Sequence, residues 1–493
     1  MSYRPTIGLE IHAELNTKTK MFCDCRNDPD ETRPNANICP VCMAHPGTLP
    51  VMNKEAVRHV LRVGVALGGT LANESVFDRK SYFYPDIPKG YQISQYERPL
   101  VSGGSLAGIA VTRIHLEEDT ARSTHVSPVA LAKEGVKGTS LVDFNRAGVP
   151  LMELVTEPVI HDAKTAGRFA RELQLLLRAL GASLANLEKG EMRIEANVSV
   201  MKEEGGPPAG GLGTKVEIKN LNSFRSVERA IEFEVARQIK RLERGEPVVQ
   251  ETRGWDEAKQ ETFHQRFKEG SADYRYFPEP DLPKFIRAEI PDFADEVIRA
   301  SLPELPWEKR VRYETLALKS SDAEYLAASI GRSAFFDAVA SELSQDVALM
   351  QTAANYIVSD LAGWYAKHGL PAGKTGREEY ANLSPAAFAK LMRMIADGSL
   401  SSRGAKDILT VLAERGGDPE QIAAEKGLLQ LTDADALRTV VRAILKTHAN
   451  VADDYRKGKE AALQFLVGQA MKETKGAGSP SLIRELIREN IGK

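Results

Sequence analysis

Polar and apolar residues alternate strictly near the start of the chain. In GLEIHAEL (residues 8–15) the polar residues are Glu10, His12 and Glu14, and apolar residues stand between them. Successive side chains of a β-strand point to opposite faces of a sheet, so this period of two predicts a strand with one charged face. A single strand of this kind leaves two interpretations open: a solvated face, or part of a site for a hard divalent cation.

Three more segments in the first half of the sequence are predicted to be strands. Residues 190–200 and 214–221 alternate cleanly and carry Glu195 and Glu217 on their polar faces, and residues 111–119 end in an acidic run. If these strands share a sheet, their acids can gather on one face. Gathered carboxylates repel one another unless a cation lies between them.

Helical periodicity dominates elsewhere. The patterns of residues 162–181 and 224–244 predict two helices in the strand-rich part. From about residue 295 onward the sequence predicts a series of helices, which segments such as HGLPAG and RGGDPE interrupt. Strands mixed with a few helices predict an α+β fold with a mostly antiparallel sheet, followed by all-α regions. We expect three domains: 1–294, 295–410 and 411–493.

Composition narrows the class of protein. A chain of 493 residues is too long for a single core, and 42% hydrophobic with 27% charged residues is ordinary for a soluble protein. The net charge of −3 excludes a polycation that grips nucleic acid along its whole length. We find no signal peptide and no apolar run long enough for a membrane helix, and we expect a cytoplasmic protein without membrane contact.

All four cysteines lie in one short stretch. Cys23 and Cys25 form one pair, Cys39 and Cys42 the other, with thirteen residues between the pairs. In a cytoplasmic chain such pairs favour a metal over disulfides, and four thiolates suit a closed, structural zinc site. Redox-active or idle thiols remain the alternative.

Common nucleotide-binding and nucleophile motifs are absent from the sequence. There is no G-x-x-x-x-G-K-[ST] phosphate loop, no G-x-G-x-x-G after a strand, and no serine in a nucleophile elbow. An enzyme with this sequence would therefore depend on carboxylates, a metal and bound phosphate rather than on a covalent intermediate.

Basic and aromatic residues are concentrated in one segment, FDRKSYFYPDIPKGYQISQYERP (residues 77–99). Bases stack on such rings, and cations hold phosphates. An aromatic loop that merely packs on the sheet is the alternative. The candidates for substrate and phosphate binding are Arg79, Lys80, Tyr82, Tyr84, Lys89 and Tyr91.

Six long motifs in order resemble one known family. They are IGLEIH, DRKSYFYPDIPKGYQISQYE, HLEEDTARSTH, LVDFNRAGVPLMELVTEP, VEIKNLNSF and ADYRYFPEPDLP, and the similarity continues through SSRGAK and FLVGQAMK. These are similar to the B subunits of tRNA-dependent amidotransferases, which convert misacylated Glu-tRNA(Gln) or Asp-tRNA(Asn) to the amidated form. The resemblance implies a cradle-shaped first domain, a helical domain and a tRNA-binding tail. It also implies a heterotrimer in which the partners are an amidase-type A subunit, the source of ammonia, and a small C subunit.

The resemblance also implies a set of catalytic residues. Those linked to Mg²⁺ fall on Glu10, His12, Glu118 and Glu217, with Lys80 in the neighbouring basic loop and Glu195 as a further catalytic acid. Alternation along 111–119 puts Glu118 on the same side as its apolar neighbours, so we expect the strand to end or bulge there.

The expected chemistry follows from the low reactivity of a carboxylate toward ammonia. A carboxylate is a poor electrophile, whereas the acyl phosphate formed from it and ATP reacts with ammonia. Forming the acyl phosphate requires positioning and charge neutralisation, not a protein nucleophile. Because this sequence has no recognisable glutaminase constellation, ammonia would come from glutamine through the A subunit. The alternative is a non-catalytic scaffold that binds tRNA and holds the A subunit.

The last residues carry a modest positive charge. Residues 430–493 contain eleven Lys and Arg against eight Asp and Glu, a net charge of +3. Arg456, Lys457 and Lys459 cluster at a Gly-containing helix start, away from an apolar run. Such a cluster can hold RNA phosphates without reading bases, although a solvated helix surface has the same pattern.

Overall fold

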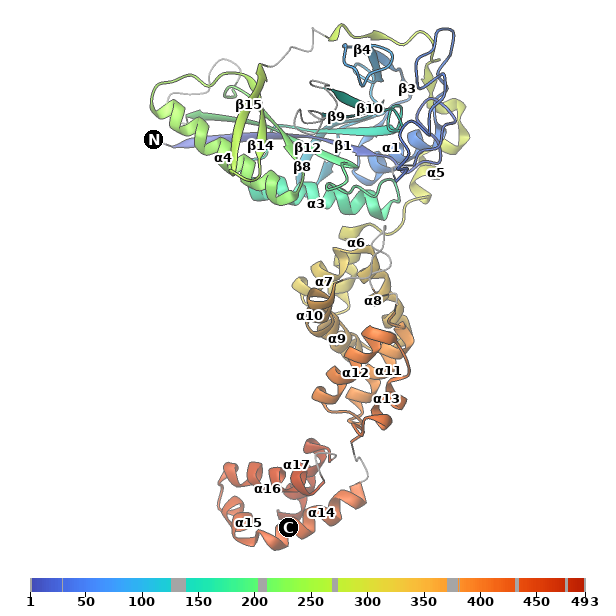
Figure 1. Cartoon of the computed structure of the whole chain (residues 1–493). Coiled ribbons are helices and arrows are strands. Elements are labelled where there is room, and N and C mark those ends of the chain that lie inside the picture. Colours follow the sequence, from blue (N-terminus) through green and yellow to red (C-terminus); the bar gives the residue numbers. More distant parts are fainter. Residues whose placement is uncertain are drawn as a thin grey trace, which may run out of the picture. The chain divides into compact units, whose positions relative to one another are not determined.

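The protein is described by a computed structural model, which covers residues 2–28, 30–125, 139–202, 211–267, 274–369, 380, 382–430, 434–474 and 478–491. It forms two compact units, Met1–Leu305 and Pro306–Lys493 (Figure 1). The first combines a large sheet with helices and the second is helical, which confirms the α+β class. Within the described ranges, no helix is long and apolar enough to cross a membrane.

A ten-stranded sheet forms the centre of the first unit, and the predicted strands are all part of it. Nine strands follow the order β15-β14-β13-β12-β1-β11-β8-β6-β2, and β7 pairs with β8. Every pairing in the described part of this sheet is antiparallel except β13 with β14, as expected for a mostly antiparallel sheet. The strands are β1 (Tyr3–Glu14), β2 (Thr70–Leu71), β6 (Val101–Ser102), β7 (Ser105–Leu106), β8 (Ile109–Glu118), β11 (Pro150–Thr156), β12 (Met192–Lys202), β13 (Val216–Leu221), β14 (Glu251–Asp256) and β15 (Glu261–Phe267).

One face of the sheet is apolar and carries helices. Leu9, Ile11 and Ala13 of β1 are at most 1% exposed. Helix α4 (Phe224–Glu243) packs against β12, β13 and β15 and against α3 (Ala163–Ala179), and α1 (Lys54–Ala66) packs against β8 and β6. Figure 1 shows α3 and α4 on the same side of the sheet. The two predicted helices are thus confirmed. The charged face of β1 is the face of the sheet that α3 and α4 do not cover.

Three small sheets complete the first unit as far as its residues are described. The largest joins β4 (Asp78–Ser81), β5 (Tyr91–Ser94) and β16 (Phe277–Pro278), so the basic and aromatic segment pairs with residues that lie about two hundred positions later. The others pair β9 (Arg122–His125) with β10 (Ser140–Asp143) and β3 (Glu74–Ser75) with β17 (Phe285–Ile286). Two short 3₁₀ turns, η2 (Arg287–Glu289) and η3 (Pro291–Phe293), and helix α5 (Asp295–Ala300) follow, so this unit extends past the predicted boundary at 294.

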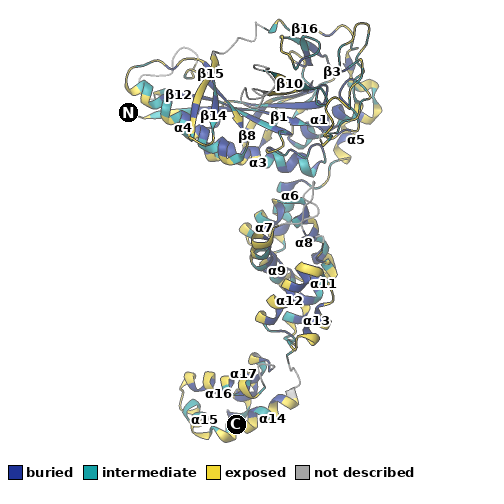
Figure 2. Ribbon diagram, viewed as in Figure 1, coloured by how far each residue is buried: buried dark blue, intermediate teal, exposed yellow. Residues whose placement is uncertain are grey.

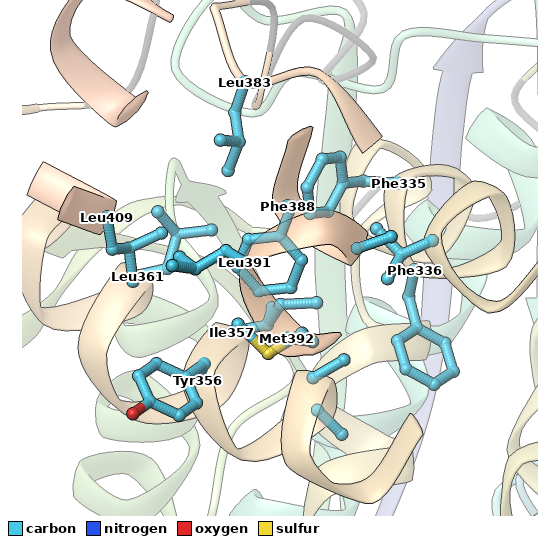
Figure 3. Packing of buried hydrophobic residues seen from close by; sticks show 14 of the residues in the cluster. Phe335, Phe336, Tyr356, Ile357, Leu361, Leu383, Phe388, Leu391, Met392 and Leu409 are labelled. Atoms are coloured by element: carbon cyan, nitrogen blue, oxygen red, sulfur yellow. The ribbon is translucent and has the colours of Figure 1, made fainter. Parts of the chain in front are cut away.

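In the described part of the second unit, the buried residues form two hydrophobic clusters. The first extends from Tyr313 to Ala423, with Phe388, Leu391 and Met392 among its packed residues (Figure 3). The second joins α14 to α17, and Figure 2 shows the exposed outer faces of these helices. The predicted boundary at 410 lies inside α12. The helical elements are α6 (Pro306–Thr315), α7 (Ser320–Ala327), α8 (Ile330–Glu342), α9 (Val347–Tyr356), η4 (Ile357–Leu361), α10 (Ala362–His368), α11 (Pro385–Ala396), α12 (Ser402–Arg415), α13 (Pro419–Glu425), α14 (Ala434–Thr447), α15 (Ala449–Arg456), α16 (Glu460–Glu473) and α17 (Pro480–Ile491).

Candidate functional site

The strand register lines up charged side chains across the middle of the large sheet. His12 lies opposite Glu153 of β11 on one side and Arg193 of β12 on the other, and Glu153 lies opposite His115 of β8. Residues directly opposite each other in antiparallel strands point to the same face. The alternation that predicts β1 therefore continues as a charged row across four strands.

Short contacts join the centre of this row. Nε2 of His12 is 3.3 Å from Oε2 of Glu153 and 3.5 Å from Oε1 of Glu117. Nε2 of His115 is also 3.3 Å from Oε2 of Glu153. Glu153 and His115 are not among the residues predicted from the sequence, although they lie within the motifs LVDFNRAGVPLMELVTEP and HLEEDTARSTH. A further signal for Glu153 is that it is a lone carboxylate in the otherwise apolar strand PLMELVT, which is costly to bury without partners.

A second group of acids adjoins the first. Carboxylate oxygens of Glu10, Glu195 and Glu217 lie within 4.8 Å of one another, and those of Glu10 and Glu153 lie equally close to a ring nitrogen of His12. Lys219 Nζ donates to both oxygens of Glu195 at 2.8 and 2.9 Å. The structure thus brings together four of the five predicted catalytic residues, from three strands.

Electrostatics within the cluster reflect a surplus of negative charge. Burial, with the nearby charges of Glu153 and Glu195, raises the pKa of Glu10 to about 7. Burial lowers the pKa of His12, but the hydrogen bond and charge of Glu153 outweigh it and raise that pKa to about 9. Although burial opposes ionisation, His115 and His12 hold the pKa of Glu153 well below its usual range. Oxygen and imidazole ligands converging on one region fit a divalent cation such as Mg²⁺.

A cavity of about 450 Å³ opens above the acids. Its acidic lining includes Glu10, Glu153 and Glu217. Rings of Tyr96 and Tyr276 stack at its edge, with centroids 4.5 Å apart. The cationic residues that line it are Lys80, Arg113, Lys215, Lys219 and Arg266. Acids that can hold a metal beside cations that can hold phosphate are the composition expected of a nucleotide-handling site.

Of the six predicted substrate-binding residues, only Lys80 lines this cavity. Arg79 instead donates to both carboxylate oxygens of Glu279 at 2.7 and 2.8 Å and lies over the ring of Tyr91, 4.3 Å from its centroid. Neighbouring side chains of a strand point to opposite faces, which explains why Arg79 and Lys80 diverge.

None of the remaining predicted binding residues lines this cavity. The Tyr82 ring contacts that of Tyr274 edge-on with centroids 5.9 Å apart, and the exposed Tyr84 accepts a hydrogen bond from Arg266 at 3.4 Å. Lys89 pairs with Glu118 at 2.6 Å. Tyr82 and Tyr84 therefore contact residues that line the cavity, whereas Lys89 and Glu118 line a different pocket.

Glu118 is the last residue of β8, so the strand ends there as expected, and the residue pairs in register with Pro150. In the described part of the chain, Glu118 is not among the acids that gather around Glu10 and His12. Its carboxylate accepts hydrogen bonds from Lys89 and from the backbone N–H of Ile93. Because side chains alternate, its neighbour Glu117 is the residue that faces His12.

The four cysteine sulfurs converge as predicted. They lie within 4.8 Å of one another without a disulfide, and Cys25 Sγ is 3.9 Å from Cys42 Sγ. Sulfurs around a tetrahedral zinc ion, with Zn–S bonds of about 2.3 Å, stand about 3.8 Å apart. The donor set and spacing therefore fit zinc.

The predicted basic cluster of the tail is exposed, but two of its three cations have acidic neighbours. Arg456 pairs with Asp453 at 2.6 Å and Lys459 with Asp454 at 3.1 Å, while Lys457 follows the end of α15. Helix α14 carries a second basic group, whose residues are not among those predicted from the sequence. Its members are Arg438, Arg442 and Lys446, all exposed and four residues apart.

Matches to known proteins extend over nearly the whole chain. The model of the GatB/GatE catalytic domain matches residues 5–290 and that of the GatB domain matches residues 334–491. The chain is 45% identical over 494 residues to the B subunit of the aspartyl/glutamyl-tRNA(Asn/Gln) amidotransferase of Thermus thermophilus, covering 99% of both chains. It is 41% identical to the like-named protein from Synechocystis, covering 98% of this chain and 97% of the relative. It is 42% identical to the B subunit of the chloroplastic/mitochondrial glutamyl-tRNA(Gln) amidotransferase of Physcomitrium patens, covering 99% of this chain and 85% of the relative. With both domain models matched and this identity sustained from end to end, the chain belongs to the family of B subunits of tRNA-dependent amidotransferases.

Proposed function

We propose that substrate activation by this amidotransferase takes place on the charged face of the large sheet. The chain takes part in the conversion of misacylated Glu-tRNA or Asp-tRNA to the amidated form. In the proposed reaction, the γ-phosphoryl group of ATP passes to the side-chain carboxylate of the amino acid, and ammonia then displaces phosphate. The observation that carries this proposal is the convergence of acids and His12 beside a cavity lined by cations.

Residues of two neighbouring groups would hold Mg²⁺. They are Glu10, His12 and Glu153 on one side and Glu10, Glu195 and Glu217 on the other, with Glu117 close to His12. When bound, the cation would neutralise charge on the phosphates of ATP. Burial and then the charges of Glu153 and Glu195 raise the pKa of Glu10, and a bound cation would offset the repulsion among these carboxylates.

The cations of the cavity would bind and orient the two anionic reactants. Lys80, Lys215 and Arg266 can hold phosphate oxygens, and Arg113, which also lines the cavity, lies 3.6 Å from Glu153. Phosphoryl transfer needs little more from the protein than positioning and neutralisation of charge. No side chain of this chain has to form a covalent intermediate.

Two partners complete the proposed reaction. Ammonia would come from glutamine through an amidase-type A subunit, with a small C subunit in the same heterotrimer, since this sequence offers no glutaminase constellation. The tail would hold the tRNA through phosphates, using Arg456, Lys457 and Lys459 together with the exposed cations of α14. Exposed ion pairs are worth little, so those of Arg456 and Lys459 would not prevent contact with RNA.

The cysteine cluster would hold one structural zinc ion. Four thiolates close the coordination shell and leave no position for water or substrate. The metal would therefore stabilise the loop of residues 23–42 and take no part in the reaction.

A reconstituted complex provides the test. The purified heterotrimer is given glutamine, ATP and either Glu-tRNA(Gln) or Asp-tRNA(Asn), and amidated product and ADP are measured. Glu153→Gln keeps shape and removes charge, so ADP formation should fall while tRNA binding and the glutaminase activity of the A subunit persist. If ADP formation is unchanged in this variant, the charged face is not catalytic and the scaffold function replaces the proposal.

A further inference from the structure

A fully buried lysine lies beside the four cysteines. The side chain of Lys20, three residues before Cys23, is among the largest that are less than 2% exposed. Its Nζ donates to the carbonyl oxygen of Phe144 at 3.2 Å and lies 3.8 Å from Sγ of Cys42. Among the residues that the structure describes, no carboxylate comes within the 4.0 Å of an ion pair with this ammonium. Its charge thus needs another partner.

Burial of an unpaired ammonium is unfavourable, and lysine is almost never fully buried without a partner. One carbonyl oxygen provides only a dipole. The remaining neighbour, Cys42 Sγ, also accepts the backbone N–H of Cys39 at 3.2 Å. Two N–H donors thus converge on this one sulfur.

The charge of a loaded cysteine centre supplies what the ammonium lacks. Four thiolates around one Zn²⁺ carry a net charge of −2. We propose that Lys20 is the built-in counter-ion of this centre, offsetting one negative charge and holding the sulfur of Cys42 by an N–H···S contact. The inference rests on the proposed zinc site.

Lys20 also joins the centre to the connection that precedes β11 of the candidate catalytic sheet. Phe144, whose carbonyl accepts from Lys20, donates its own N–H to Asn35 of the cysteine loop at 2.8 Å. Nearby, Asn37 donates its N–H to the Asn145 side chain at 2.8 Å. This segment leads directly into β11, the strand that carries Glu153. A loaded centre would therefore brace the entry to that strand.

The zinc affinity of the assembled complex tests whether Lys20 acts as the counter-ion of the cysteine centre. Lys20→Met removes the charge at similar volume, Lys20→Arg retains it, and Lys18→Met is the control, because Lys18 is exposed two residues earlier. Competition with a chromophoric chelator should show zinc bound about 10–100-fold more weakly in Lys20→Met, the usual cost of losing a group that supports metal ligands. Lys20→Arg should retain most of the affinity and Lys18→Met all of it. Wild-type affinity in Lys20→Met would overturn the inference, whereas wild-type protein without zinc would overturn the zinc site itself.

If Lys20→Met folds poorly, the counter-ion role can still be tested in a protein without the four cysteines. Replacing all four cysteines by serine removes the negative charge, so the ammonium then has nothing to neutralise. Lys20→Met should lower the melting temperature or solubility of the native-cysteine protein and leave the serine background unchanged or more stable. An equal loss in both backgrounds would mean that Lys20 serves only its bond to Phe144, and the counter-ion role would be refuted.

Discussion

Arg79 offers a direct choice between two roles for a basic residue near the cavity. The sequence suggests that it binds phosphate, whereas in the structure its guanidinium pairs with both oxygens of Glu279. The Glu279 side chain is 1% exposed and that of Arg79 is 19% exposed. We predict that Arg79→Met destabilises the first unit, because it leaves the Glu279 carboxylate buried without a counter-charge.

The expected size follows from burial. Removing one partner of a buried ion pair costs about 3–5 kcal/mol, and the partial exposure of Arg79 favours the lower end, about 3 kcal/mol. The first unit spans Met1–Leu305, and at about 2 cal/mol/K per residue its unfolding entropy is about 0.6 kcal/mol/K. The melting temperature should therefore fall by about 5 °C. The double variant Arg79→Met with Glu279→Met should recover most of this loss, because it leaves no buried charge.

Calorimetric melting of the variants, together with the KM for ATP in the assembled complex, distinguishes the two roles. Arg79→Lys keeps the charge but not the two parallel hydrogen bonds, so its melting temperature should be intermediate. A several-fold higher KM for ATP in Arg79→Met, with an unchanged melting temperature and no recovery in the double variant, would refute the ion-pair role. Arg79 would then bind phosphate, as the sequence suggests.

Glu117→Gln should raise the Mg²⁺ concentration for half-maximal ADP formation about 10–100-fold, whereas Glu118→Gln should not; equal effects would contradict the assignment of the two residues to opposite faces. Reversing Lys457 and Lys459 to Glu should weaken tRNA binding, and filter binding with an unchanged affinity and salt slope would exclude this cluster as a phosphate contact. Metal analysis should find one zinc per chain, and its removal by a chelator should lower the melting temperature of the first unit; an apo form of equal stability would argue against a structural metal. Burial opposes ionisation of Asp119, but Arg193 and Arg146 lower its pKa to about 2. This depressed pKa adds stability that is present above the ordinary aspartate pKa and lost as pH falls toward 2, so Asp119→Asn should flatten the loss of stability in acid melts.

Local patterns in the sequence determine much of the first unit. Alternation in GLEIHAEL predicts β1 and its charged face, because the two-residue period of a strand is a property of the backbone itself. The helix over 162–181 is equally local, since its leucines recur at helical spacing and Asp162 caps its first turn. The cysteine cluster is predictable for the same reason: both pairs lie on short turns of one loop, so little tertiary structure is needed to bring them together.

Tertiary structure decides which local faces meet. Glu153 joins His12 only because β11 pairs with β1 in one particular register, and a shift by one residue would turn its carboxylate to the other face. Alternation along β8 shows that Glu117 and Glu118 point to different sides, but it does not show which side carries the helices. Only the packed sheet therefore identifies Glu117 as the residue that faces His12. Arg79 finds Glu279 two hundred residues away through the β4–β16 pairing. Short-range backbone geometry thus determines the elements, while side-chain partners distant in sequence depend on packing and register, which no local pattern encodes.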